Sequence, residues 1–255
     1  MTTVAAGNCA RFAARSTSSG GTPTSHWLRW ERRFASLDLT SCPGLVVVAA
    51  HPDDETLGLG GMMAALTAAG VHVEVVLVSD GGAAYPTLSR LQRSRLERIR
   101  RFEFAKAASI LGVDGTICLG LPDGEIAEHE AWLAEQLAAF LVQRPSGVWC
   151  AATWRGDGHP DHEGVGRAAW SAARRTGAVL LEYPIWMWHW ALPDDFAVPW
   201  SRARSVPLTQ SDIQRKRDAA ECFRSQLMPP DGHEPAVLPP FVVRRLFAVG
   251  EVVFV

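Results

Sequence analysis

The chain has 255 residues, of which 47% are hydrophobic and 20% are charged, and its formal net charge at pH 7 is −2. This length is sufficient for one α/β domain with a substantial core. The composition argues against intrinsic disorder, and the near-neutral charge argues against a nucleic-acid-binding protein. No apolar run approaches the about 20 residues of a membrane span, and the N-terminus lacks the apolar segment of a secretory signal.

The cysteines indicate the cellular compartment. The chain has five of them, an odd number, widely spaced and without a C-x-x-C pair. This pattern favours neither a disulfide framework nor a thiolate zinc site. We therefore expect a cytoplasmic protein. The cysteines are Cys9, Cys42, Cys118, Cys150 and Cys222.

Residues 1–43 are expected to form an extension that precedes the catalytic domain. Residues 1–24 are rich in Ala, Ser, Thr and Gly, and Ser16–Thr22 has the composition of a flexible linker, so this part is predicted to be a mobile tail. Apolar residues then recur at helical spacing, which predicts a short amphipathic helix. They are Trp27, Trp30, Phe34 and Leu37.

Residues 44–255 are expected to form a single catalytic domain in which strands alternate with helices. The expected strands are 45–50, 71–78, 116–119, 148–153, 178–183 and 251–255. The expected helices are one from about residue 57, 88–111, 127–142, one after His162, and 211–225. Val-rich strands separated by helices predict a Rossmann-like α/β fold, with a mostly parallel sheet covered by helices on both faces. In such sheets ligands bind at the carboxyl ends of the strands.

Three features have more than one interpretation. Gly58–Gly61 lacks both G-x-G-x-x-G and a Walker lysine, so we expect close packing of a helix against the sheet rather than a phosphate site. Most arginines between residues 90 and 101 are expected on a solvated helix face, although one of them can reach the ligand pocket. The aromatic segment Trp186–Trp190 fits core packing and sugar stacking equally well.

Two polar clusters predict a metal site. The first, His51-Pro52-Asp53-Asp54-Glu55, directly follows an apolar strand, and the second is Gly158-His159-Pro160-Asp161-His162-Glu163. A zinc ion that supports hydrolysis needs three protein ligands and one open position. His51, Asp54 and His162 can supply these ligands.

Three neighbouring residues have the chemistry of a catalytic set. Asp53, beside a ligand on a tight turn, can accept a proton from water as a general base. His159 can stabilise an oxyanion or protonate a leaving amine. Asp161 can orient His159 by accepting its other N–H, or it can simply cap a helix.

Together these residues resemble the LmbE-like, or N-acetylglucosaminyl-phosphatidylinositol de-N-acetylase (PIG-L), metal-dependent deacetylases. The likeness covers about residues 44–255. It implies that His51, Asp54 and His162 bind zinc, that Asp53 is the base and that His159 is the acid or electrostatic residue. Further segments similar to the family pattern are Ser79–Gly82, Arg100, Glu103, Leu119–Gly124, Lys216 and Phe223–Gln226.

We therefore predict a zinc-dependent amide hydrolase, specifically an N-deacetylase of an N-acetylglucosaminyl or another N-acylated small molecule, with Fe²⁺ or another divalent metal as a substitute for zinc. A hydratase or an amidase of a thiol–sugar conjugate on the same fold is the alternative. Two histidines and a carboxylate also form the facial triad of Fe(II) oxygenases, but those are expected on a double-sheet barrel. A non-catalytic binding protein is the third possibility. The sequence leaves the oligomeric state open.

Overall fold

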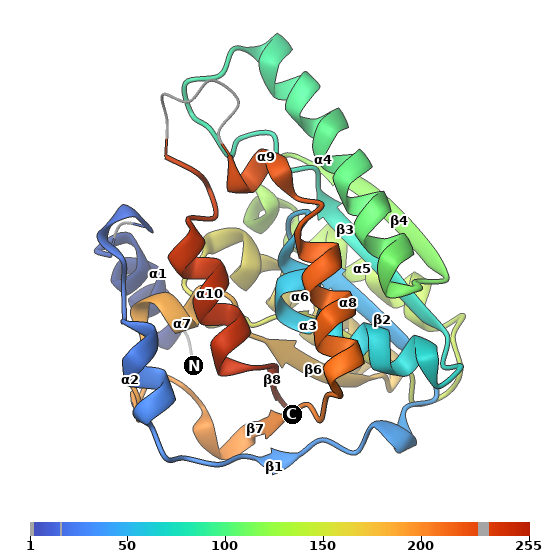
Figure 1. Ribbon diagram of the computed structural model, residues 1–255. Helices are drawn as coiled ribbons and strands as arrows, with labels where there is room; N and C mark the ends of the chain where they lie inside the picture. The colour runs from blue at the N-terminus through green and yellow to red at the C-terminus, as the bar shows by residue number, and fades with distance from the viewer. Residues whose placement is uncertain (1–2, 16, 229–234) are drawn as a thin grey trace.

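Eight strands pair into one sheet in the computed structural model, which describes residues 3–15, 17–228 and 235–255. Their order across the sheet is β1-β7-β8-β6-β5-β2-β3-β4 (Figure 1). The strands are β1 (Ala35–Ser36), β2 (Leu45–Ala49), β3 (Val73–Ser79), β4 (Gly115–Leu121), β5 (Trp149–Thr153), β6 (Val179–Tyr183), β7 (Ala203–Ser205) and β8 (Val252–Phe254).

The sheet is parallel except at β8, which runs antiparallel to both β6 and β7. Strand β2 lies between β3 and β5 and is parallel to both. From β2 the chain proceeds to β3 and β4 on one side, then returns to β5 and β6 on the other. Ligands of doubly wound sheets bind at such a reversal, beyond the carboxyl ends of the two central strands. Here that position lies beyond β2 and β5.

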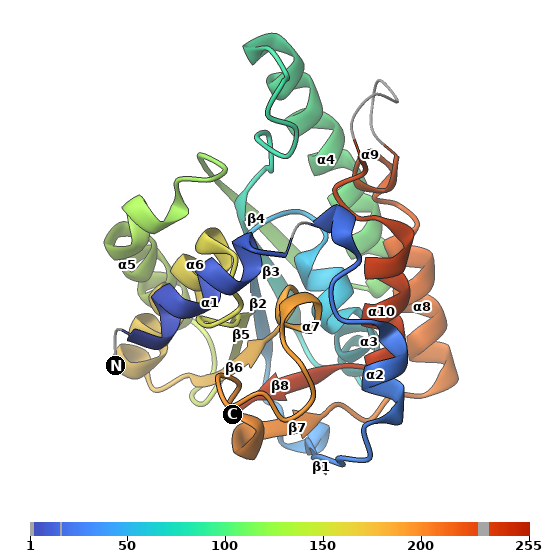
Figure 2. The same cartoon turned by 90° about the vertical axis from the view of Figure 1, so that its left-hand side faces the viewer.

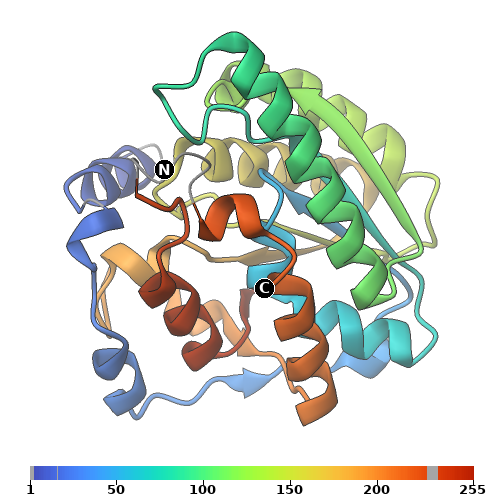
Figure 3. The same ribbon diagram turned by 45° about the horizontal axis from the view of Figure 1, so that its top comes forward.

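Helices cover both faces of the sheet. Figure 2 shows α5 and α6 on one face and α3, α8 and α10 on the other, and Figure 3 shows α8 and α10, in orange and red, on the same side of the sheet. The helices are α1 (Thr3–Ala13), α2 (Thr24–Arg29), α3 (Asp54–Ala68), α4 (Arg90–Leu111), α5 (Glu130–Leu141), α6 (Pro160–Thr176), α7 (Met187–Trp190), α8 (Gln210–Ala220), α9 (Arg224–Leu227) and α10 (Pro240–Val249).

Each face of the sheet has its own hydrophobic core. Every residue of β2 is buried, because successive side chains point to opposite faces and helices cover both. Val47 packs with residues of α3, α4, α8 and α10. Val46 and Val48 pack with residues of α5 and α6. Gly58 allows α3 to approach the sheet, since a Cβ there would lie 2.4 Å from the Tyr183 ring.

The predicted fold class is confirmed: the sheet is mostly parallel and lies between two layers of helices. Helix α4 begins and ends near the residues that the sequence indicated, whereas α6 begins at Pro160, so His162 lies within this helix rather than before it. A capping box at Ser89 starts α4, and Pro160 is the first residue of α6. Both helices end at a left-handed glycine. Strands β1 and β7 and helix α10 were not expected, because the two strands are very short and α10 follows a proline-rich loop.

The N-terminal extension differs from its prediction. Residues 3–13 form helix α1 rather than an unstructured tail, while residues 1, 2 and 16 of that tail lie outside the described residues. Helix α2 ends at Arg29, so of the four predicted apolar residues only Trp27 lies in it, and Trp30, Phe34 and Leu37 follow it outside any helix. Strand β1 pairs with β7, which joins the extension to the main sheet. Ser, Thr and Gly content describes only local flexibility, whereas α1 is held by contacts with distant residues. Among the described helices, none has the length and apolar character needed to cross a bilayer.

Candidate active site

The loops that follow β2 and β5 bring three predicted metal ligands together. Asp54 lies at the start of α3, and its Oδ2 atom is 3.4 Å from His51 Nδ1 and 3.2 Å from His162 Nε2. All three side chains are buried. Ligands about 2.1 Å from a tetrahedral metal lie about 3.4 Å from one another. Both distances are therefore those expected between ligands of one metal ion, and all three atoms lie within 4.8 Å of one another.

The hydrogen bonds of the two histidines also fit a metal. His162 Nε2 is buried and makes no hydrogen bond within the described part of the chain, so a metal bound there would displace no hydrogen-bond partner. The opposite nitrogen, Nδ1, lies 2.8 Å from Asp157 Oδ2. His51 shows the same pattern, since its Nε2 lies 3.0 Å from Asp123 Oδ1 and 3.1 Å from Asp161 Oδ2. A carboxylate on the far nitrogen is the usual way in which a protein orients a metal-binding imidazole.

Asp161 has a different partner from the one predicted. Its carboxylate contacts His51 and accepts hydrogen bonds from the backbone N–H groups of Gly124 and Ile126. Only its own backbone N–H reaches His159, at 3.3 Å from Nδ1. The prediction that the Asp161 side chain orients His159 is therefore wrong. Neighbours in sequence at the start of a helix point in different directions, and Asp161 points toward the β2 loop.

His51, His159 and Asp161 form a second group with donor atoms close enough for a metal. In this group the Asp161 oxygens already accept backbone hydrogen bonds, and His159 Nδ1 accepts one as well. In the first group Asp54 Oδ2 also accepts a backbone N–H, from His51, but the buried Nε2 of His162 has no hydrogen-bond partner among the described residues and lies 3.2 Å from that oxygen. The group of His51, Asp54 and His162 fits a metal better.

Asp53 lies beside this group in a strained backbone conformation. Its φ angle is +127°, which is unfavourable for a residue with a side chain and is the kind of outlier that clusters at functional sites. Burial and the charge of Asp54 raise the pKa of Asp53 well above its ordinary value, although Arg100 partly offsets this. The Arg100 guanidinium is 3.6 Å from Asp53 Oδ2 and donates hydrogen bonds to the carbonyls of Gly81 and Pro52. Arg100 is thus the one member of the arginine-rich helix face that lines the pocket.

His159 borders the same site, with its ring centroid 5.1 Å from that of His51 and 4.7 Å from that of His162. Burial, together with His162 and His51, lowers the pKa of His159 to about 3. The ring is therefore neutral at pH 7. Because Nδ1 accepts the Asp161 N–H, the proton of the neutral ring resides on Nε2. A neutral His159 can donate a hydrogen bond, which fits the oxyanion-stabilising role among the two that the sequence suggested.

The pKa values of the two metal-site histidines, His51 and His162, are shifted in the opposite direction to that of His159. Burial disfavours the imidazolium of His162, but Asp54 and Asp157 outweigh it and raise the pKa to about 9. Burial acts the same way on His51, and its contacts with Asp123, Asp161 and Asp54 raise its pKa well above the ordinary value. Without a metal, both imidazole rings are therefore protonated, and carboxylates surround them. This arrangement concentrates negative charge where a divalent cation would bind.

A cavity of about 640 Å³ opens over these residues. His51, Asp53, Asp54 and His159 line its floor, and Trp186 lines a wall. All three tryptophans of the aromatic segment are buried in the core, and among them only Trp186 also lines the cavity. Core packing therefore holds for the whole segment, and sugar stacking stays a prediction for Trp186.

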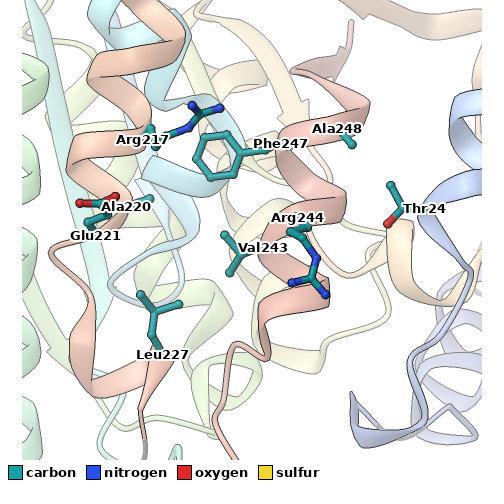
Figure 4. Close-up of a pocket in the computed structure, with 9 residues that line it drawn as sticks. All are labelled: Thr24, Arg217, Ala220, Glu221, Leu227, Val243, Arg244, Phe247 and Ala248. Carbon is teal, nitrogen blue, oxygen red and sulfur yellow. The ribbon is translucent and has the colours of Figure 1, made fainter.

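A second cavity, of about 610 Å³, lies between α8 and α10 and contains no candidate metal or catalytic residue. In Figure 4 the Arg217 side chain extends over the Phe247 ring, with Val243 and Leu227 further along the same groove. The candidate metal and catalytic residues all lie at the first cavity or beside it.

Sequence reasoning missed Asp157 and did not give Asp123 a role. Asp157 is fully buried, and its carboxylate accepts the backbone N–H groups of Ile185, Trp186 and Met187 as well as contacting His162. The only signal was its position between two glycines just before the second cluster. Asp123 follows β4, and its other oxygen accepts the Ala83 N–H.

The protein therefore has an α/β fold with a candidate metal site at the carboxyl ends of the central strands. Two buried histidines and one buried carboxylate form this site. Residues 46–173 match the PIG-L family, described as GlcNAc-PI de-N-acetylase, and the chain belongs to this family. The predicted resemblance is confirmed. The matched segment contains all six predicted site residues, namely His51, Asp53, Asp54, His159, Asp161 and His162.

A named relative agrees with this assignment, and solved structures share the fold. A 1D-myo-inositol 2-acetamido-2-deoxy-alpha-D-glucopyranoside deacetylase from Catenulispora acidiphila is 35% identical over 159 residues, covering 52% of this chain and 49% of that protein. The chain thus spans about half the length of this curated relative. The N,N'-diacetylchitobiose deacetylase of Pyrococcus horikoshii shares the fold, with a TM-score of 0.58, 23% identity and coverage of 76% and 74% of the two chains. The hydratase GalB of Pseudomonas putida shares it too, with a TM-score of 0.56, 19% identity and coverage of 81% and 84%.

Proposed function

We propose that this protein is a zinc-dependent N-deacetylase that hydrolyses the acetamide of an N-acetylglucosaminyl compound or a similar N-acylated amino sugar. The observation that supports this most strongly is the position of Asp54 between two imidazole nitrogens, one of which has no other partner. The activity in the names of its family and relatives agrees with this chemistry. A divalent cation bound there would supply Lewis-acid chemistry, since it lowers the pKa of water toward about 7 and polarises an amide carbonyl.

Two further residues complete the proposed reaction. Asp53 accepts a proton from water, and its raised pKa suits it to hold that proton and pass it to the leaving amine. Arg100 keeps the Asp53 carboxylate in place through the contact at 3.6 Å. His159, neutral with its proton on Nε2, donates a hydrogen bond to the oxygen that becomes negative in the transition state.

A hydratase is the second candidate, because GalB carries that activity on the same fold. The two reactions use the same activated water but differ in product. Hydrolysis of an acetamide releases acetate and a primary amine in equal amounts, whereas hydration adds water without releasing a fragment. The double-sheet barrel expected for an Fe(II) oxygenase is absent from the described chain, which has one mostly parallel sheet.

The test is to remove bound metal, reload the protein separately with Zn²⁺ and Fe²⁺, and incubate each form with N-acetylglucosamine, its glycosides and other N-acylated amino sugars. Two metals are needed because two histidines and a carboxylate bind both. We expect acetate and free amine in a one-to-one ratio with the zinc form, and none with zinc-treated His51→Ala. Consumption of substrate without acetate would replace the deacetylase with the hydratase. No turnover with either metal would favour a binding protein.

Two further predictions concern the kind of substrate and the cellular location of the protein. We infer a small, sugar-containing substrate, in line with the compound named for the Catenulispora relative. The cytoplasmic location predicted from the cysteines remains a prediction.

A further inference from the structure

The cavity over the metal site is built from two kinds of residue. Its polar floor, including His51 and Asp54, lies within the family-matched segment 46–173. Much of its apolar wall lies outside that segment. These outer residues are Phe12, Ile185, Trp186, Pro235, Val237 and Leu238. The family match therefore accounts for the chemistry of the floor but not for this part of the wall.

Phe12, on α1, is a wall residue that lies beside the proposed reaction. Its ring centroid lies 5.1 Å from that of Trp186 and 6.1 Å from that of His159. Trp186 is buried, whereas Phe12 is half-buried. The two rings are tilted by 40°, so together they form an aromatic corner beside the imidazole that is proposed to contact the substrate oxygen.

Helix α1 contacts the domain at three points, and these contacts fix the position of Phe12 next to Trp186. Asn8 is buried, and its side chain donates a hydrogen bond to the Gly156 carbonyl at 2.9 Å. Cys9 Sγ lies 3.3 Å from Glu163 on α6, where Figure 2 shows α1 against that helix. Arg11 forms an ion pair with Asp195 and lies 4.4 Å above the Trp190 ring. Polar groups with distant, matching partners distinguish α1 from a tail that merely rests on the surface.

The loop that carries His159 is shaped to accept α1. Gly158 has a φ angle of +91°, and a Cβ there would lie 2.9 Å from the Phe12 Cβ and 3.0 Å from the Asn8 carbonyl oxygen. A side chain at position 158 would push α1 away from the site. The catalytic loop and the N-terminal helix therefore fit each other at the residue next to His159.

We propose that α1 is part of the substrate site, and that Phe12 and Trp186 bind an apolar group carried by the N-acyl amino sugar next to the reacting amide. This inference rests on the proposed function. Besides Phe12 and Trp186, the lining includes Pro86, Ile185 and Leu238, so an apolar group would find several contacts there. The apolar group can be an aglycone or a longer acyl chain, and the substrates of the test distinguish the two.

The test compares kcat/KM for three substrates: the methyl glycoside of N-acetylglucosamine, its phenyl glycoside, and the methyl glycoside of N-hexanoylglucosamine. The zinc-loaded wild type should prefer one of the last two over the first by about tenfold or more, since loss of contact with about two methylene groups changes affinity by that much. Preference for the phenyl glycoside identifies an aglycone, and preference for the hexanoyl compound identifies an acyl chain. Phe12→Ala should remove most of the preference, and Phe12→Leu should keep part of it.

Phe196→Ala is the matched control, because Phe196 is 98% exposed and lies outside the cavity. It should leave the preference unchanged. Equal kcat/KM for all three substrates in the wild type, or an equal loss for all three in Phe12→Ala, would overturn the proposal. If no substrate is hydrolysed, the proposed function fails, and titration calorimetry of the phenyl glycoside with metal-free protein then decides. Weaker binding by Phe12→Ala would support the aromatic corner, and equal binding would refute it.

Discussion

Metal binding by the metal-free protein should release protons and should strengthen as the pH rises. His162 can coordinate a metal only through an unprotonated Nε2, yet Asp54 and Asp157 overcome the effect of burial and raise its pKa to about 9. The ring is therefore protonated below about pH 9, and the proton must leave when the metal binds. Because His162 is charged at low pH and neutral at high pH, the affinity for the metal falls as the pH falls below about 9.

The size of this change in metal affinity follows from the difference between the working pH and the pKa of His162. At pH 7, about two units below it, removing the proton from His162 costs on the order of 3 kcal/mol, which weakens apparent affinity about 100-fold relative to pH 9. His51, whose pKa is also raised well above its ordinary value, adds a second proton. We expect release of about two protons per zinc at pH 7.

Calorimetry of zinc binding in buffers of different ionisation enthalpy measures the number of protons released, and competition with a chelator measures affinity between pH 6.5 and 8.5. Asp157→Asn removes one charge beside His162 and should reduce the dependence of affinity on pH. Asp218→Asn is the matched control for Asp157→Asn, because it changes the net charge equally. Asp218 is exposed and lies on α8. Release of fewer than about half a proton by the wild type, or an unchanged pH dependence in Asp157→Asn, would refute this account of the site.

Two further substitutions test the base and the core. Asp53→Asn should keep zinc stoichiometry while lowering kcat by about 10² or more, whereas His51→Ala should lose the metal; similar metal loss in both would mean that Asp53 is a ligand. Lys216→Met should lower the free energy of unfolding in urea by about 3–5 kcal/mol, because it leaves the carboxylate of Glu251 buried without the cation now 2.8 Å away. The same replacement at Arg175, which forms an exposed ion pair, should have little effect, and equal losses at the two positions would contradict the argument.

The sequence by itself determined the α/β alternation and the types of residue in the metal site. Both are local properties. A strand buried on two faces must be continuously apolar, as Leu45–Ala49 is, and a histidine and an aspartate three residues apart on one turn can be read directly. The parallel order of the strands then implies that the residues after β2 and β5 meet at one edge of the sheet.

Only the tertiary structure decided which partner each polar group has. Asp161 contacts His51 rather than its near neighbour His159, and Asp157 contacts His162 while it caps the chain at Ile185–Met187. The same holds for α1, whose composition suggested a free tail but whose Asn8 side chain bonds to a carbonyl 148 residues away. Such contacts depend on how segments distant in the chain pack together, and no local spacing or composition encodes them.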